Sequence, residues 1–165
     1  DGLVHPNLLM QFDVAQQRYD LAIDTNPNCS LAWLLRGTLH AFKGEGQLAV
    51  EDTLKARILS PLDPHRYFYD SLSSSANFAA GNYEKAVELA QRSLKANRTH
   101  TSTLRVLAVS QWQLGKEEEA RDIADELLRL EPDLTVSGWL KRAPSADFKI
   151  GQEFANLLKK IGIPD

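Results

Sequence analysis

The 165-residue sequence has one cysteine, one methionine, no excess of positive charge and no long apolar run. The single Cys29 cannot form an internal disulfide and has no Cys or His nearby at metal-ligand spacing, which favours a reducing, cytoplasmic compartment. With 22 acidic against 19 basic residues, the chain lacks the basic excess that nucleic-acid binding requires. No segment approaches the roughly 18 apolar residues of a membrane-spanning helix. Nucleic acid and membrane are therefore not expected as partners.

What the chain does have is enough apolar residues, 43%, to bury a continuous core. Its first residue is Asp1, and the pattern described below begins inside a unit. We therefore expect a piece of a longer protein, although a processed N-terminus would look the same.

The sequence repeats with a period close to 34 residues. An alanine marks the same point of each unit, at spacings of 34, 37 and 34: Ala15, Ala49, Ala86 and Ala120. A second set follows seven residues later: Ala22, Ala56, Ser93 and Leu127. Five residues before the last three alanines stand Gly44, Gly81 and Gly115, and a proline recurs as Pro27, Pro61 and Pro132. This self-similarity predicts a repeat array.

Within each unit, apolar residues recur at intervals of three and four, as in Leu31, Leu34, Leu35 and Leu39. This spacing places them on one side of a helix. Each unit is then helix, glycine turn, helix and proline. We predict an all-α chain with helices at about 7–25, 30–43, 47–59, 64–80, 83–96, 101–114, 117–130, 133–142 and 146–161.

The unit at residues 30–63 resembles a tetratricopeptide repeat, because these residues stand at the signature positions of that family: Trp33, Gly37, Gly44, Ala49, Ala56 and Pro61. The later units match through Gly81, Ala86, Gly115, Ala120 and Pro132. The resemblance implies a right-handed solenoid of helix-turn-helix units. It divides the chain into a truncated leading repeat (1–29, second helix only), a repeat (30–63), a degenerate repeat (64–100), a repeat (101–134) and C-terminal capping helices (135–165).

The irregular segments carry predictions of their own. Asp63 and Pro64 are typical of an N-cap and a first-turn proline, so we expect the first helix of the degenerate unit to start early and run long. Met10 stands where a turn glycine would be, which predicts an uninterrupted helix from about residue 7. After a short capping helix ended by Pro144, an amphipathic helix is expected, with Ser145 as its N-cap and Gly162 as its stop.

A looser resemblance covers more of the chain. The NPNCSLAWLLRG segment, the SPLDP link, the serine-rich helix and the IGIPD tail look like the C-terminal repeat region of bacterial multidomain signalling proteins. These are chiefly class III adenylate/guanylate cyclases, and winged-helix regulators carry similar repeats. No cyclase catalytic motif is present here. The resemblance implies a cytoplasmic regulatory or docking appendage.

No arrangement of residues predicts catalysis, a metal or a cofactor. The histidines His5, His40, His65 and His100 have no spacing that places two on one helical face. The Ser73 to Ser75 run lacks the elbow motif of a nucleophilic serine and is interpreted as small polar packing. A weaker alternative is a small-molecule sensor in a polar pocket around Asp70, Ser73 and Asn77.

The first helices of a helix-pair solenoid line its concave surface, which is the usual binding face. The tetratricopeptide resemblance places the partner-binding groove at Leu31, Leu34, Leu35, Thr38, Phe42, Phe68, Ser71, Leu72, Ser75, Ala79, Ser102, Arg105, Val106, Val109 and Gln113. This groove is apolar with one cation, Arg105, so we predict no binding of acidic chaperone tails. An amphipathic helix could enter it, and the nearest candidate is the 146–161 helix of this or a neighbouring chain.

We therefore predict a protein-interaction scaffold in a bacterial signalling protein, not an enzyme as this fragment. Its expected partner is an apolar or amphipathic protein segment. Two alternatives stay open: a regulatory part of a nucleotide cyclase with its catalytic domain elsewhere, and a homo-oligomerisation module that forms a homodimer. In a further alternative, the groove is filled by packing within the array and nothing binds.

Overall fold

The computed structural model describes residues 6–165. Over this range the chain forms helices and no strand: α1 (Pro6–Thr25), α2 (Ser30–Lys43), α3 (Gly46–Leu59), α4 (Arg66–Ala79), α5 (Tyr83–Ala96), α6 (Thr101–Gln113), α7 (Glu117–Leu130), α8 (Val136–Leu140) and α9 (Lys149–Ile161). The predicted all-α fold is confirmed. His5 lies outside the described residues.

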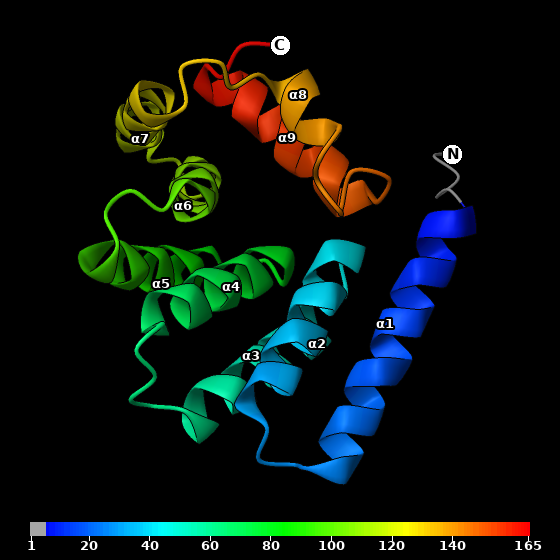
Figure 1. Ribbon diagram of the computed structural model, residues 1–165. Helices are drawn as coiled ribbons and strands as arrows, with labels where there is room; N and C mark the ends of the chain where they lie inside the picture. Colours follow the sequence, from blue (N-terminus) through cyan, green and yellow to red (C-terminus); the bar gives the residue numbers. More distant parts are fainter. Residues whose placement is uncertain (1–5) are drawn as a thin grey trace.

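The helices stack as consecutive antiparallel pairs, α2 with α3, α4 with α5 and α6 with α7 (Figure 1). The first helices of the pairs contact one another, α2 with α4 and α4 with α6, and form one face of the array. At one end α1 packs against α2. At the other end α9 packs against α6 and α7 and reaches back to α2. The C-terminal helices therefore close the array and also cross its inner face.

The glycine turns and the alanines act as the repeat predicts. Gly44, Gly81 and Gly115 have φ angles of 79°, 78° and 77°, in the left-handed region that residues with a Cβ seldom adopt. The alanines of the three complete pairs, Ala49, Ala86 and Ala120, are fully buried at 0% exposure. A methyl group at these crossings lets two helices approach closely, whereas a larger side chain would separate them.

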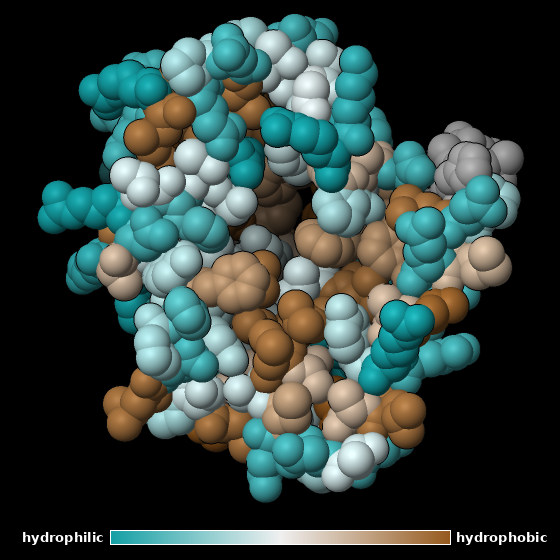
Figure 2. All heavy atoms as spheres, in the orientation of Figure 1, coloured by the Kyte–Doolittle hydropathy of each residue, from teal (hydrophilic) through white to brown (hydrophobic). Residues whose placement is uncertain are grey.

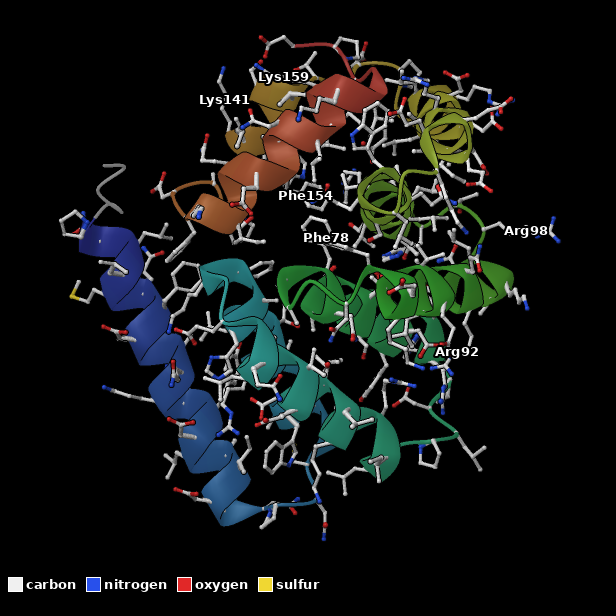
Figure 3. The ribbon with its side chains drawn as sticks, turned by 180° about the vertical axis from the view of Figure 1, so that it is seen from behind. Phe78, Arg92, Arg98, Lys141, Phe154 and Lys159 are labelled. Carbon is white, nitrogen blue, oxygen red and sulfur yellow. The ribbon has the colours of Figure 1, made fainter. Side chains whose placement is uncertain are left out.

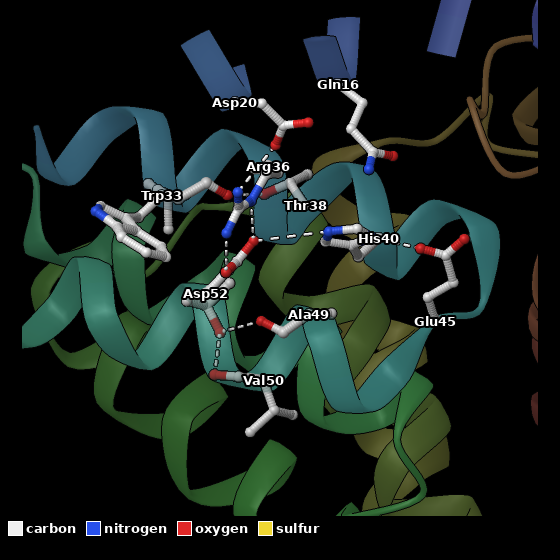
Figure 4. A network of polar contacts seen from close by, with 12 residues as sticks. Gln16, Asp20, Trp33, Arg36, Thr38, His40, Glu45, Ala49, Val50 and Asp52 are labelled. Carbon is white, nitrogen blue, oxygen red and sulfur yellow. Dashed lines mark hydrogen bonds and ion pairs between the residues drawn. The ribbon is translucent and has the colours of Figure 1, made fainter. Parts of the chain in front are cut away.

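Ion pairs that are wholly or partly buried hold neighbouring helices together. Arg36 of α2 donates to both carboxylate oxygens of Asp52 in α3, at 2.7 and 2.9 Å, and to Asp20 of α1 at 2.9 Å (Figure 4). His40 of α2 lies between Asp52 and Glu45, with its Nε2 atom 3.7 Å from Asp52. These contacts join α1, α2 and α3 through one polar cluster.

The prediction of an early start for α4 is wrong. This helix begins at Arg66 and has 14 residues, like its neighbours. Asp63 does not cap it; instead its Oδ1 atom accepts a hydrogen bond from the backbone N–H of His65 at 2.8 Å. That bond closes a turn within the longer connection, so the three extra residues lengthen the link and not the helix.

The C-terminal segment also differs from its prediction. The N-cap of α9 is Phe148 and not Ser145, because the chain first makes further turns at residues 141–147. The backbone of Ser145 crosses the first turn of α9, where a Cβ on Gly151 would lie 2.0 Å from the Ser145 oxygen. The short helix α8 is capped by Thr135, whose Oγ1 accepts from the Gly138 N–H at 3.0 Å. Gly162 ends α9 as predicted, with φ 119°.

Candidate functional site

A cavity of about 410 Å³ opens on the inner face of the array, between the first helices and the C-terminal segment. Figure 2 shows this hollow between α4, α6 and α9, with apolar residues gathered over α2 and α4 beside it. Its walls come from α2, α4 and α6 on one side and from residues 139–154 on the other. A cavity of this size accepts a short peptide segment or a small molecule.

The floor of the cavity is apolar and aromatic. Phe42 of α2, Phe68 and Leu72 of α4 and Val106 of α6 contribute from the repeat helices. Each first helix uses part of its apolar face to pack against the second helix of its unit. These side chains lie on the part of that face that remains uncovered. Such a surface favours an apolar side chain of a ligand over a charged one.

The far wall is built by aromatic contacts across the array. Phe78 of α4 faces Phe154 of α9 with ring centroids 5.4 Å apart (Figure 3), and Trp139 stacks on Phe154 at 5.0 Å. Phe148 meets Phe12 of α1 at 5.4 Å, which ties the C-terminal segment to the other end of the array. The cavity is therefore formed by segments far apart in sequence.

The rim of the cavity carries charge. Arg105 pairs with Glu131 at 3.1 Å and donates to Ser102 at 3.0 Å. Burial lowers the pKa of Arg105, the charge of Glu131 opposes that shift, and Arg142, which also lines the cavity, lowers it further. Arg142 donates from Nε to the Gly138 carbonyl at 3.3 Å. Arg105 was the one cation among the predicted groove positions, and the C-terminal segment adds a second arginine, Arg142, to the same cavity.

His100 lines the same rim, and its environment leads to a prediction for how stability depends on pH. Burial and the nearby Arg105 lower its pKa below the ordinary value of 6.5. As pH falls through about 6.5, the unfolded chain therefore binds a proton before the folded chain does, and stability is lost. When the pH is lowered from about 7.5 to about 5.5, the Tm of the His100→Asn variant should fall less than the Tm of the wild type. The expected difference between the two falls is on the order of 1 °C.

Thermal unfolding followed by circular dichroism measures this difference. His65→Asn is the matched control, since His65 lies exposed in a turn. A His100→Asn variant that loses as much Tm as the wild type would contradict the assignment.

The structure gathers part of the predicted groove into the cavity: Phe42, Phe68, Ser71, Leu72, Ser75, Ala79, Ser102, Arg105 and Val106. Leu34 and Val109 are instead fully buried in the core, and Leu31 is exposed outside the cavity. Leu35 and Thr38 lie on α2 beyond it, with the Thr38 hydroxyl donating to the Leu34 carbonyl. Gln113 bonds to the Tyr83 hydroxyl.

Sequence reasoning missed the residues that the C-terminal segment adds to the cavity, chiefly Trp139, Arg142 and Ile150. The sequence did offer the 146–161 helix of this or a neighbouring chain as a candidate to enter the groove. In the structure α9 covers one side of the groove and leaves the cavity beside it. The available signal was the amphipathic pattern of residues 146–161, which includes Phe148 and Phe154, since such a face needs a surface to cover.

Asp70, Ser73 and Asn77, the polar residues of the alternative sensor pocket, are buried by packing within the chain. Asp70 and Ser73 are 1% exposed and Asn77 is 6% exposed. Asp70 is held by Arg92 and lies 3.5 Å from Nε of Arg57, so its charge is compensated within the chain. These residues line none of the described cavities. The sensor interpretation has no space for a ligand in this structure.

Within residues 6–165, no group of three or more His, Cys, Asp or Glu side chains is placed to hold a metal ion. Nor does this part of the chain contain a helix with the length and apolar character needed to span a membrane.

Comparison with known proteins identifies the repeat. Two family profiles, each described as a tetratricopeptide repeat, match residues 10–64 and 77–137. The chain is built of tetratricopeptide repeats. These repeats form a family of protein-interaction modules, not of enzymes, in agreement with the prediction for this fragment. Neither match concerns the cyclase C-terminal region, so that resemblance stays a prediction.

Solved tetratricopeptide repeat structures share the fold at low sequence identity. The structure of MamA has a TM-score of 0.64 and 18% identity, covering 91% of this chain and 88% of that chain. YrrB, described as having an unusual peptide-binding site, has a TM-score of 0.62 and 14% identity over 93% and 79% of the two chains. The first repeat domain of Spaghetti (RPAP3), bound to the HSP90 peptide SRMEEVD, has a TM-score of 0.58 and 21% identity over 80% and 91%. No curated protein sequence matches the chain.

Proposed function

We propose that this protein binds an apolar segment of a partner protein in the cavity between α2, α4, α6 and the C-terminal segment. The observation that carries the proposal is the cavity itself, whose floor of Phe42, Phe68 and Leu72 remains open after α9 has packed on the array. A structural cap would need to cover only the end of the solenoid. This segment instead builds a second wall.

The partner is expected to insert one or two large apolar side chains. The cavity is large enough for a few side chains but too small for a whole helix. Burying one large apolar side chain contributes about 1.5–3 kcal/mol, so binding would be moderate and specific for shape. Arg105 and Arg142 at the rim would then orient polar backbone groups of the same segment.

Selection from a displayed library of random peptides tests this function. Peptides enriched on the wild-type protein should be apolar and should bind Ser75→Trp at least about tenfold more weakly, because an indole at position 75 fills the cavity. Ser137→Trp is the matched control, since Ser137 is exposed on α8 and does not line the cavity. Equal binding to both variants, with melting temperatures unchanged, would contradict the proposal.

We predict that the acidic peptide SRMEEVD, present in the RPAP3 complex, does not bind this chain at micromolar concentration. Arg105 is already paired with Glu131, and its side chain is only 15% exposed, so of the two arginines that line the cavity only the exposed Arg142 is left to meet an acidic tail. Isothermal titration measures the interaction. A Kd below about 10 μM would overturn the prediction.

The setting of this module is a further proposal. The looser resemblance supports a C-terminal docking or regulatory region of a bacterial cytoplasmic signalling protein. In its alternative form the same region regulates a nucleotide cyclase. A homodimer formed by exchange of α9 is also open, and light scattering on the chain with and without residues 145–165 distinguishes it from a monomer.

A further inference from the structure

The outer side of α1 is a helix face that no other described helix covers (Figure 1). It carries a shallow hollow of about 480 Å³, lined by Met10, Val14 and Tyr19 with Gln11, Ala15 and Arg18. Met10 is 62% exposed and Val14 is 43% exposed. This hollow shares no lining residue with the cavity of the proposed function.

The equivalent positions in the next repeat unit show what kind of element packs on this face. One period separates α1 from α3, so Ala15 corresponds to Ala49 and Arg18 to Asp52. In α3 both positions are buried, Ala49 at 0% and Asp52 at 5% exposure, and α2 packs against this helix. In α1, Ala15 is only half-buried and Arg18 is exposed. The face on α1 therefore corresponds to one that a first helix covers in the next unit.

The charge of Arg18 indicates what kind of helix would fit this face. Asp52 of α3 receives Arg36 from the first helix of its own unit in a bidentate ion pair. Arg18 occupies the equivalent place on α1 with the opposite sign, and it pairs with no carboxylate among residues 6–165. A helix seated on α1 as α2 sits on α3 would thus bring its own residue at the Arg36 position against Arg18. An acidic residue there completes the pair.

We propose that the outer face of α1 docks an amphipathic partner helix that presents a Glu or Asp to Arg18. The occupant sits on α1 as α2 sits on α3. Its apolar side covers Ala15 and Tyr19, which correspond to the buried Ala49 and Thr53 of α3, and its acid reaches Arg18.

A tethered probe tests this docking in the full chain. The probe is a copy of residues 30–43, which form a first helix, joined ahead of Asp1 by a flexible Gly/Ser linker so that its effective concentration is high. With Arg36→Glu in the probe, Tm should rise by about 3 °C or more over a fusion carrying only linker. The unmodified probe, which places arginine against Arg18, should give a smaller rise.

Reversing the charge of the face supplies the control. In the Arg18→Glu chain the order of the two probes should invert, because the unmodified probe now offers the opposite charge. Arg18 is exposed, so this substitution leaves the fold intact.

If neither probe raises the melting temperature of either chain above that of the linker-only fusion, the proposal is overturned. Equal rises with either probe would contradict the acidic character of the partner. A dimer of the unfused chain that Arg18→Glu dissociates would assign the face to a second copy and overturn the proposal as well.

Discussion

Replacing Asp70 with alanine is expected to lower the free energy of unfolding by about 3 kcal/mol, which corresponds to a fall in Tm of about 6–12 °C. The Asp70 side chain is 2% exposed and lies between Arg92 of α5, at 2.7 Å, and Arg57 of α3. Burial lowers the pKa of Arg57, so its positive charge is already unfavourable where it stands. Without Asp70 that charge stays buried and uncompensated. Arg92 is 39% exposed and can turn to water, which limits the loss.

Thermal unfolding of Asp70→Ala beside Glu88→Ala separates this effect from the loss of an exposed ion pair. Glu88 pairs with Lys85 on the surface and is 59% exposed, so its removal should change Tm by less than about 2 °C. An Asp70→Ala protein that melts like the wild type would show that the buried pair does not stabilise the fold. A role in ligand binding would then have to be considered again.

Replacing Gly46 with alanine is expected to lower the free energy of unfolding by about 3 kcal/mol. A Cβ at this position would lie 2.4 Å from Cα and 2.5 Å from N of Ala80, at the end of α4. These are backbone atoms, so relief requires moving α3 away from α4. Helix propensity alone predicts the opposite sign, because alanine stabilises a helix by about 0.5–1 kcal/mol relative to glycine.

Urea unfolding of Gly46→Ala and Gly81→Ala compares a glycine required by close packing with a glycine required by a positive φ angle. A Cβ at Gly81 meets nothing within 4 Å, and the cost there comes only from its φ of 78°, about 1–2 kcal/mol. A Gly46→Ala protein more stable than the wild type would mean that α3 and α4 are less closely packed than the structure shows.

The repeat made most of the helices predictable. The period of small residues placed the crossings at Ala49, Ala86 and Ala120, and all three are fully buried. Met10 at a turn position predicted the continuous α1, which runs from Pro6 to Thr25. These predictions succeeded because they rest on local pattern, repeated in phase, and a repeat contacts mainly its neighbours.

The failures lie where the chain leaves that pattern. Asp63 and Pro64 have the residue types of a helix start, but the Asp63 carboxylate closes a turn with His65 instead. Ser145 likewise fits an N-cap, yet its backbone crosses over Gly151 at the start of α9. In both places the same residue type can cap a helix or form a turn, two local structures of similar energy. Contacts with distant segments determine which of the two forms.

By itself, the sequence determined the helix-pair solenoid, its register and the helices that line the inner face, because small residues and glycines recur at one period. Only the tertiary structure decided that α9 folds back toward α2, that Trp139 and Phe154 build a second wall, and that Arg142 joins Arg105 at the rim. The physical reason is that these contacts join segments outside the repeat, whose pairing depends on shape and charge across the folded array and leaves no period in the sequence.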